Sequence, residues 1–435
     1  MSLRHTVALS LYGVVTWALQ PWLRRKLARR GRVEPGYLQA VPERFGCYSL
    51  PATQGGIWVH AVSLGETRAA AVLIQAIRKQ WPGVPLVLTH GTATGREEGQ
   101  RLLQAGDMQV WQPWDTSDAV SKFLRHFKPR VGVLMETEVW PHLVAGCQRH
   151  GIPLILANAR LSEKTFQQAC QWAWLSRPAY AGLSTVWAQT EADAMRLRAL
   201  GASVSAVLGN LKFDATPNAA QLQAGRAERT RHSRPVVLLA SSREGEEALW
   251  LQALNALPSA RTSVQWWVVP RHPQRFDAVH DLLAQAGWRV VRRSQQTASV
   301  GDGVVTEMGQ PTVWLGDTLG EMPYYFGLAD VALLGGSFEK LGGQNLIEAA
   351  ACGCPVIMGP HTFNFLEAAE GAVQAGAAWR AEDMAQAVAT AVQWVQDDAG
   401  LVARARTAEQ FVQSHRGAAQ RSVEALGAWL APKAP

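Results

Sequence analysis

The sequence predicts an α/β protein made of two doubly wound domains, each built on a parallel sheet. Short apolar runs alternate with helical patterns from residue 55 onward, as expected for strands that helices cover on both faces. The alternation breaks once, near residues 214–234, and then starts again. The length of 435 residues is enough for two or three domains, so two sheets and one linker fit the chain.

Composition excludes several other classes of protein. Hydrophobic residues make up 48% of the chain and charged residues 18%, which rules out a mainly disordered protein. Five scattered cysteines form no CxxC pair, which excludes a disulfide scaffold and suits a reducing compartment. Cys352 and Cys354 lack partners at metal-finger spacing, so we expect two packed core thiols.

The N-terminus predicts a contact with a membrane surface. Residues 6–19 are largely apolar, and nine residues without an acid then carry Arg24, Arg25, Lys26, Arg29, Arg30 and Arg32. A secretory signal has the opposite charge order, and fourteen residues are short for a span of about 20. Residues 1–32 are therefore expected to be a monotopic or barely spanning anchor with its arginines on anionic headgroups. The alternative is a helix docked on the protein's own surface. No basic-aromatic motif supports nucleic-acid binding as the reason for the net charge of +7.

The first domain is expected over residues 33–216. Its apolar runs predict strands at residues 57–62, 86–89, 131–135, 154–157, 185–188 and 204–208. A helix follows the first strand over residues 69–77, and Trp81-Pro82-Gly83 ends it.

A linker with a surface helix is expected at residues 217–234, followed by the second domain at 235–405. Its strands are expected at residues 236–241, 264–269, 288–291, 331–334 and 355–358. A helical tail, residues 406–435, would brace the first domain. Two such domains would place a cleft between the carboxyl ends of both sheets, which is the default ligand site.

Three segments of the first domain carry candidate site residues. Glu66 starts a helix after a strand and a glycine turn, so it is either a general base or a carboxylate favoured at a helix N-terminus. Glu136 and Glu138 follow a buried strand and would share a face if that strand continued; the alternative is a solvated charge pair. Lys212, after the last strand, would either neutralise an anionic substrate or remain solvated.

Two segments of the second domain are candidates for phosphate binding. Prolines bracket Arg271 and His272 after a strand, and a rigid turn that holds an arginine fork suits a phosphate. Glycines at 335–336, 342–343 and 353 would let backbone approach a ligand, and a helix starting near Asn345 would aim N–H groups at a phosphate. Glu348, one turn into that helix, could accept hydrogen bonds from a ribose. The segment is neither a dinucleotide fingerprint nor a Walker A loop, and a packing turn is the alternative.

Together these segments resemble the 3-deoxy-D-manno-oct-2-ulosonic acid (Kdo) transferases, membrane-associated GT-B glycosyltransferases of lipopolysaccharide synthesis. The similarity runs in order through HAVSLGE (60–66), METEVWP (135–141), ANARLS (157–162), GNLKFD (209–214), PRHPQRF (270–276), GDTLGEM (316–322) and GPHTFNF (359–365). So many separated matches in one order make coincidence improbable.

The resemblance implies a GT-B fold of two Rossmann-like domains facing a cleft, and inverting transfer of Kdo from CMP-Kdo to a lipid A precursor (lipid IVA). Glu66 matches the catalytic base, and Glu136 and Lys212 match positions that stabilise the transition state. The CMP-binding positions fall on Pro270, Arg271, Leu319, Gly320, Glu321, Asn345, Leu346, Ile347 and Glu348. Gln344, Leu346 and Arg243 depart from residues that are frequent in relatives, which affects the donor side.

The resemblance also implies a place on the cytoplasmic side of the cell inner membrane. No cofactor is expected beyond the donor substrate, and no tightly bound metal, because no Asp-x-Asp motif is present. The expected partners are the lipid A precursor, CMP-Kdo and the membrane surface, without nucleic acid. One alternative is a GT-B enzyme with another donor such as a UDP-sugar. The other is a catalytically idle membrane-bound adaptor, against which the intact Glu66 argues.

Overall fold

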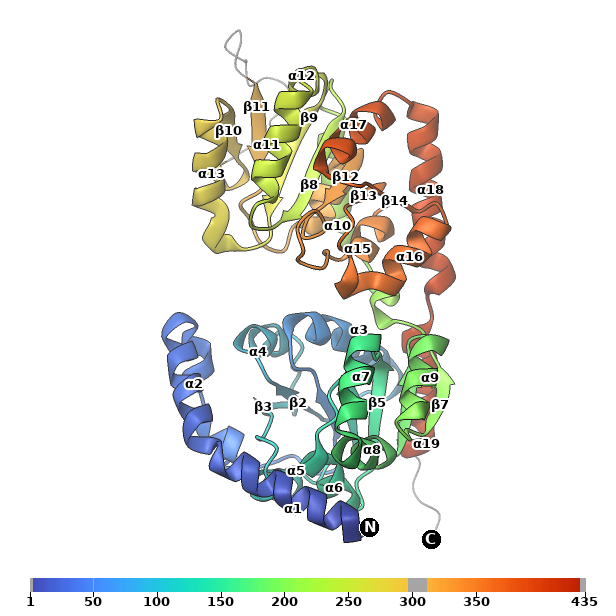
Figure 1. The fold of residues 1–435 in the computed structure, drawn as a ribbon. Coiled ribbons are helices and arrows are strands. Elements are labelled where there is room, and N and C mark those ends of the chain that lie inside the picture. Colours follow the sequence, from blue (N-terminus) through green and yellow to red (C-terminus); the bar gives the residue numbers. More distant parts are fainter. Residues whose placement is uncertain (1–2, 50, 296–310, 431–435) are drawn as a thin grey trace. The chain divides into compact units, whose positions relative to one another are not determined.

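The computed structural model describes residues 3–49, 51–295 and 311–430. The chain forms two compact units, one made of Met1–Asp214 with His415–Pro435 and the other of Ala215–Ser414 (Figure 1). Residues 1–2 of the expected anchor, residues 296–310 of the expected second domain and residues 431–435 of the expected tail lie outside the described part.

The first unit is built on a parallel sheet with strand order β3-β2-β1-β4-β5-β6-β7. The strands are β1 (Ile57–His60), β2 (Leu86–His90), β3 (Met108–Trp111), β4 (Val131–Met135), β5 (Leu154–Ala159), β6 (Thr185–Ala188) and β7 (Val204–Val207). The doubly wound prediction is confirmed, but the sequence analysis missed β3. This edge strand leaves Met108 and Gln109 half-exposed, so it has no continuous apolar run.

Helices cover both faces of this sheet. They are α1 (Leu3–Ala18), α2 (Gln20–Val33), α3 (Leu64–Gln80), α4 (Ala93–Gln100), α5 (Ser117–Phe127), α6 (Pro141–Arg149), α7 (Glu163–Gln171), α8 (Ala173–Ala181), α9 (Glu191–Ala199) and α19 (Ala418–Leu430), with 3-10 helices η1 (Pro35–Leu38), η2 (Val41–Phe45) and η3 (Leu211–Asp214). Successive side chains of β1 point to opposite faces of the sheet and so belong to two separate cores. Trp58 packs on the side of α5 and α6, whereas Ile57 and Val59 pack on the side of α3 and α19.

The N-terminal helix α1 is docked on the first unit along one side and exposed along another (Figure 1). Ala8 and Leu9 are buried, and Tyr12 hydrogen-bonds Asp115, whose carboxylate also accepts two backbone N–H groups at the start of α6. The opposite stripe carries exposed Val7, Leu11 and Val14. In the described residues, no helix has both the length and the apolar character needed to cross a membrane.

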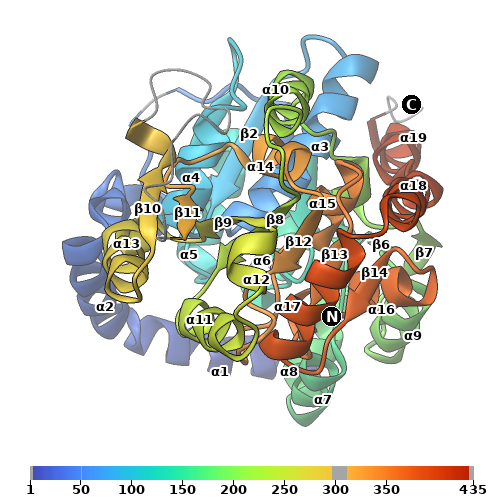
Figure 2. The same ribbon diagram turned by 90° about the horizontal axis from the view of Figure 1, so that it is seen from above.

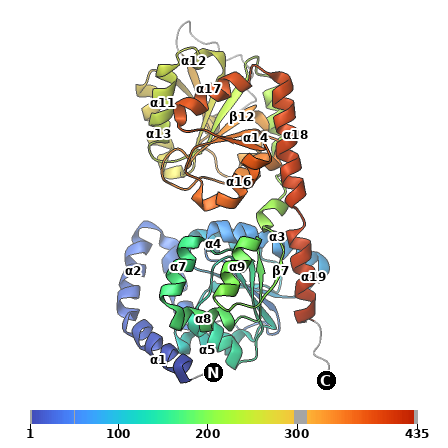
Figure 3. The ribbon, with the colours of Figure 1, turned by 45° about the vertical axis from the view of Figure 1, so that its right-hand side comes forward.

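The C-terminal helix α19 packs beside α3 in the first unit, as Figure 3 shows. Asp214 at the end of η3 accepts hydrogen bonds from the backbone N–H groups of Gly417 at 2.5 Å and Ala419 at 2.6 Å. The Asp214 carboxylate therefore satisfies donors at the start of α19 that have no partner within the helix. Helix α19 thus braces the helix that carries Glu66, whereas residues 406–414 of the expected tail belong to the second unit.

Asp214→Ala is expected to lower the free energy of unfolding by about 1–2 kcal/mol, because it leaves the start of α19 uncapped. Denaturant titration measures the loss, and hydrogen exchange in α19 locates it. The control is Asp281→Ala, which removes an exposed carboxylate that contacts His280 and should change stability by less than about 0.5 kcal/mol. Equal effects of the two substitutions would show that Asp214 does not hold α19.

The second unit repeats the architecture with strand order β10-β11-β9-β8-β12-β13-β14 (Figure 2). The strands are β8 (Val236–Ser242), β9 (Gln265–Pro270), β10 (Arg289–Arg292), β11 (Thr312–Leu315), β12 (Val331–Leu334), β13 (Val356–Met358) and β14 (Ala378–Arg380). The sequence analysis missed β11 and β14. Both are short, and β14 is an edge strand of three residues, too short for a recognisable apolar run.

Helices flank this sheet on two sides, with α10 and α14 on one and α11, α12 and α17 on the other (Figure 2). The helices are α10 (Ala219–Arg229), α11 (Glu246–Ala256), α12 (Ala260–Ser263), α13 (Phe276–Gln285), α14 (Met322–Leu328), α15 (Leu346–Ala351), α16 (Leu366–Gln374), α17 (Met384–Trp394) and α18 (Asp398–His415), with 3-10 helices η4 (Pro273–Arg275), η5 (Arg293–Gln295) and η6 (Phe363–Phe365). Cys352 and Cys354 are buried free thiols.

Helix α10, which lies in the stretch expected to be a linker, packs closely on α14. A Cβ at Gly225 would lie 2.1 Å from the carbonyl oxygen of Tyr324, and one at Gly327 would lie 2.5 Å from that of Leu222. Glycine at both positions therefore lets the two backbones meet, and α10 belongs to the second unit.

Candidate functional site

Some of the candidate residues follow the strands at which the winding direction of each sheet reverses. The first unit reverses between β1 and β4, and the second between β8 and β12. Ligands of doubly wound sheets bind outside the carboxyl ends of the strands at this switch point. Glu66 follows β1 and Glu136 follows β4, so the two carboxylates flank the switch point of the first unit.

Glu66 is held in the first turn of α3 by a reciprocal cap. Ser63 accepts a hydrogen bond from the Glu66 N–H, and the Ser63 hydroxyl donates to Glu66 Oε1 at 3.1 Å. The Val62 N–H donates to Glu66 Oε2 at 2.8 Å. Burial raises the pKa of Glu66 to about 7, and the charges of Glu136 and Glu138 act in the same direction. A carboxyl with that pKa can accept a proton near neutral pH.

Glu136 is the centre of a buried charge cluster. Its Oε1 lies 2.9 Å from Lys212 Nζ, and its Oε2 lies 2.7 Å from Arg160 Nε. Burial by itself would raise the pKa of Glu136, but Lys212 and Arg160 outweigh it and hold that pKa below its ordinary value. The carboxylate therefore stays ionised and fixes two cations beside the switch point.

Backbone contacts around Glu136 position both of its cationic partners. The Arg160 N–H donates to the Glu136 carbonyl oxygen, so main chain and side chain both join these residues. Asn158 Oδ1 accepts from the Leu211 N–H at 2.9 Å, which ties the β5 loop to the segment carrying Lys212. The sequence analysis included Arg160 in a matched motif but gave it no role, because the sequence does not show which strands are neighbours.

Glu136 and Glu138 do not share a face. The strand β4 ends at Met135, and Glu136 has φ +56°, a left-handed conformation that turns the chain. Glu138 is half-buried and accepts a hydrogen bond from Trp140 Nε1 at 2.8 Å. The condition for a shared face, a strand that continues past Met135, is not met, and Arg160 and Lys212 pair with Glu136.

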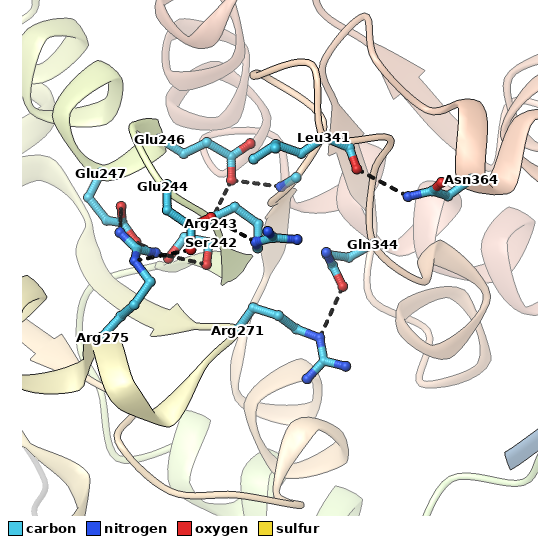
Figure 4. A network of polar contacts seen from close by, with 11 residues as sticks. Ser242, Arg243, Glu244, Glu246, Glu247, Arg271, Arg275, Leu341, Gln344 and Asn364 are labelled. Atoms are coloured by element: carbon cyan, nitrogen blue, oxygen red, sulfur yellow. Dashed lines mark hydrogen bonds and ion pairs between the residues drawn. The ribbon is translucent and has the colours of Figure 1, made fainter. Parts of the chain in front are cut away.

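In the second unit, Arg271 and Gln344 meet beside the switch point (Figure 4). Arg271 follows β9, its backbone N–H donates to the Ser242 carbonyl oxygen, and its Nε donates to Gln344 Oε1 at 3.2 Å. Gln344 follows the glycine pair 342–343, both of which have positive φ. The phosphate candidate Arg271 is thus oriented by the side chain of Gln344.

Two buried carboxylates that the sequence analysis missed hold this part of the second unit together (Figure 4). Glu246 accepts from the backbone N–H groups of Arg243, Gly336 and Phe338, at distances from 2.6 to 3.0 Å. Glu247 forms a two-pronged pair with Arg275, at 2.9 and 2.7 Å. In the sequence both look like ordinary acids at the start of a helix, so no pattern distinguishes them.

Of the remaining predicted donor positions, Pro270 ends β9, Leu319–Glu321 follow β11, and Asn345–Glu348 lie at the start of α15. Leu319 is exposed and Gly320 has φ +79°, in the turn before α14. Glu321 accepts a hydrogen bond from the Thr318 hydroxyl. These residues follow β11, the neighbour of the β9 strand that Arg271 follows.

Asn345 caps α15, and Glu348 lies in the first turn of that helix. The side chains of Leu346 and Ile347 are buried, so at these two positions only the backbone could face a ligand. The Ile347 N–H already donates to Asn345 Oδ1. In the described residues, His, Cys, Asp and Glu form no group of three that could hold a metal ion.

Comparisons with known proteins give a consistent family assignment. Residues 39–215 match the family model described as "3-Deoxy-D-manno-octulosonic-acid transferase (kdotransferase)". The chain is 44% identical to the 3-deoxy-D-manno-octulosonic acid transferase of Bordetella pertussis over 434 residues, which are 98% of this chain and 99% of that protein. It is 31% identical to the enzyme of the same name from Haemophilus influenzae over 404 residues, 91% of this chain and 92% of that one.

A solved structure supports the fold. The UDP-GlcNAc 2-epimerase of Neisseria meningitidis, solved with UDP-GlcNAc bound, aligns with a TM-score of 0.57 over 86% of this chain and 100% of its own, at 16% identity. With the two parallel sheets described above, this similarity confirms the predicted GT-B fold class.

Proposed function

This chain belongs to the Kdo transferase family, and from that premise we propose that it moves Kdo from CMP-Kdo to a lipid A precursor (lipid IVA), with inversion at the anomeric carbon. Its class is plain: it is a glycosyltransferase of lipopolysaccharide biosynthesis. The observation that carries the proposed reaction is the 44% identity with a Kdo transferase over nearly the whole chain.

Glu66 would act as the general base. It would take the proton from the acceptor hydroxyl as the oxygen attacks the anomeric carbon and the bond to the CMP phosphate breaks. Direct attack from the face opposite the leaving group inverts the configuration. The pKa of about 7 supports this role, since an efficient base titrates near the working pH.

Lys212 would face the carboxylate of the Kdo unit. That carboxylate is attached to the reacting carbon, which gains positive charge in an oxocarbenium-like transition state. Glu136, held by Lys212 and Arg160, fixes the ammonium group in one place before the substrate binds. Such preorganised charge is a strong source of rate enhancement, because it needs no rearrangement during the reaction.

The second unit would bind the CMP part of the donor. Arg271 would stabilise the negative charge that develops on the phosphate as it leaves, and its bond to Gln344 supports a fixed orientation. Glu348 would accept hydrogen bonds from ribose hydroxyls. The end of β9 at Pro270, the turn at Leu319–Glu321 and the start of α15 at Asn345–Ile347 would surround the bound CMP. No cofactor is proposed.

A competition assay tests the donor. Purified protein receives lipid IVA and CMP-Kdo made in situ, and CMP or UDP is added as competitor. We expect CMP to inhibit and UDP to have little effect. Inhibition by UDP with none by CMP would contradict the proposed donor and favour a transferase that uses a UDP-sugar.

We further propose that α1 and α2 hold the enzyme on the cytoplasmic face of the inner membrane, where a lipid acceptor resides. Val7, Leu11 and Val14 are 60%, 55% and 64% exposed and recur at helical spacing on one side of α1. The basic residues of α2 follow immediately and suit anionic headgroups.

The triple variant Val7→Gln, Leu11→Gln, Val14→Gln should bind anionic vesicles at least about tenfold more weakly, because each apolar side chain contributes roughly 1.5–3 kcal/mol when fully buried. Vesicle sedimentation measures the change. The packed residues Ala8, Leu9 and Tyr12 are untouched, so the helix stays docked.

The matched control is Met195→Gln, Leu366→Gln, Val402→Gln, which removes three exposed apolar side chains elsewhere. It should bind vesicles like the wild type. Equal binding by both triple variants would show that the α1 stripe is not the membrane contact.

A further inference from the structure

One arginine outside the proposed machinery is buried without an ionic partner. Arg44, in η2, is only 5% exposed. In the part of the chain that the structure describes, its guanidinium donates one hydrogen bond, from Nη2 to the Gly91 carbonyl oxygen at 3.3 Å, and its Nε has no partner. Buried charges are ordinarily paired, because an unpaired one is costly to remove from water.

Two further arginines gather with Arg44 around two parallel rings. Arg44 lies 3.8 Å and Arg96 4.8 Å from the centre of the Trp111 ring. Tyr37 stacks on Trp111 at 6.2 Å with an interplanar angle of 9°, and Arg30 lies 4.7 Å from the Tyr37 ring centre. We name Arg30, Tyr37, Arg44, Arg96 and Trp111 the arginine–aromatic cluster.

The charges of this cluster do not balance. Glu43 pairs with Arg96 at 2.9 Å and accepts from the Trp111 N–H, and within the described residues no other carboxylate forms a salt bridge with Arg30, Arg44 or Arg96. Burial lowers the pKa of Arg44 to about 10; Tyr37 and Glu43 act against this shift, whereas Arg96 and Arg30 act in the same direction as burial. Three cations against one carboxylate give the cluster a net charge of about +2, and of these cations Arg44 is buried and Arg30 is exposed to solvent.

Stacking on the rings does not satisfy these cations fully. A ring attracts the face of a guanidinium, whereas the N–H donors lie in its plane and need an acceptor at the edge. Nε of Arg44 lacks one among the described residues. An anion with several oxygens would fill the edge and balance the charge.

The cluster joins the basic helix α2, which carries Arg30, to the ends of strands β2 and β3 in the first unit. Arg24 of α2 stacks on Phe45, the residue after Arg44, at 3.7 Å. Gly91 follows β2 directly, and Trp111 ends β3. Strand β2 pairs with β1 in parallel, so the cluster shares the carboxyl edge of the sheet with Glu66.

We propose that the arginine–aromatic cluster binds a phosphate monoester. Such a group carries a charge of about −1.5 to −2 at pH 7, which matches the net positive charge of the cluster, and arginine forks suit its oxygens. On the proposed function, on which this assignment rests, the group is a phosphate of the lipid acceptor. Its binding would position the acceptor hydroxyl relative to Glu66.

Arg44→Lys tests the site, because it keeps the charge but removes Nε and the planar fork. The acceptor is presented in neutral detergent micelles, once with its phosphates and once with each phosphate removed. We expect the variant to raise KM for the phosphorylated acceptor by about ten- to a hundredfold, with kcat nearly unchanged. Removing from the acceptor the phosphate that the cluster binds should raise KM for the wild type by a similar factor. The same removal should not raise KM further for Arg44→Lys.

The control is Arg125→Lys, an exposed arginine of α5 that bonds the Ser121 carbonyl oxygen, and it should leave KM unchanged. If Arg44→Lys does not fold, exposed Arg30→Gln takes its place, with an expected rise in KM of about threefold or more. An unchanged KM for a folded Arg44 variant, or failing that for Arg30→Gln, overturns the proposal.

Inorganic phosphate separates the two sources of the ligand. Its binding is measured by titration calorimetry and needs no activity. Binding that Arg44→Lys weakens, together with the KM effect, supports a lipid phosphate. Weakened binding with unchanged KM values would assign the cluster to a free anion and overturn the acceptor assignment. A wild type that binds phosphate but transfers no Kdo would contradict the proposed function and leave the anion site standing.

Discussion

Glu66→Gln is expected to lower kcat for Kdo transfer by about 10²–10⁴-fold, the range that general base catalysis contributes. Glutamine has the same shape and can still accept from the Val62 N–H, so the cap at the start of α3 should persist. The loss would then arise from the missing base and not from unfolding. Initial rates with saturating donor and acceptor measure it.

The control is Glu163→Gln, an exposed glutamate in the first turn of α7. It shares with Glu66 the favourable position at a helix N-terminus, but it is not buried near other carboxylates. Its kcat should equal that of the wild type. A Glu66→Gln enzyme with wild-type kcat would eliminate Glu66 as the base.

The pH dependence gives a second readout of the same group. The base must be ionised, and burial raises the pKa of Glu66 to about 7, so kcat should fall as the pH drops through 7. The Gln variant should lack this limb of the profile.

The stability of the fold should depend on pH in the opposite sense to kcat, because the protonated form of Glu66 is the one that the folded protein favours. The folded protein holds the Glu66 proton more tightly than the unfolded chain, so its contribution is present at low pH and is lost as the pH rises from about 4.5 to 7. At pH 8, Glu66→Gln should therefore have a Tm at or above that of the wild type. A lower Tm at that pH would indicate that the Glu66 carboxylate stabilises the fold.

Lys212→Met is expected to lower kcat by about 10²–10³-fold, as removal of one preorganised charge does in other enzymes. Methionine keeps much of the apolar stem but cannot balance the substrate carboxylate. Glu136 would also lose the cation that lowers its pKa most, so the pKa of Glu136 should rise. Kinetics and a thermal melt of the same preparation separate the two effects.

Arg160→Gln is the matched control, because it removes the other cation of Glu136 and leaves Lys212 in place. The Arg160 side chain is 44% exposed, so its loss should affect stability modestly. We expect kcat to fall by less than about tenfold. Equal losses of kcat for Lys212→Met and Arg160→Gln would mean that Lys212 acts only by holding Glu136.

The central strands were predicted from their continuous apolar runs, but burial does not account for every strand: β7 and β10 are half-exposed and were predicted, whereas β11 is mostly buried and was missed. Residues 131–135 form a continuous apolar run because β4 is central and covered on both faces. Strand β3 lies at an edge of the sheet, and its polar Gln109 and half-exposed Met108 interrupt the apolar run that would have predicted a strand. Helix α10 was expected as a surface helix of the linker, and its packing on α14 was not predicted because that packing depends on Gly225 and Gly327, which give no apolar periodicity.

The sequence predicted the candidate residues one at a time, but it did not predict which side chains they contact. Glu136, Arg160 and Lys212 come from the ends of different strands and meet only because parallel pairing brings those ends to one edge. Arg44 and Glu246 gave no signal, because a single charge in a polar stretch looks solvated until its burial is known. Motif similarity provided the expected roles, whereas the pairing required the fold.

The most direct test of the account is the mass of the lipid product. Purified protein is incubated with lipid IVA and CMP-Kdo made in situ, with a known Kdo transferase in parallel, and the lipid is analysed by mass spectrometry. We predict a lipid heavier by one or more Kdo units, and no such product with Glu66→Gln in the same time. An unchanged lipid beside a working parallel enzyme would contradict the proposed reaction.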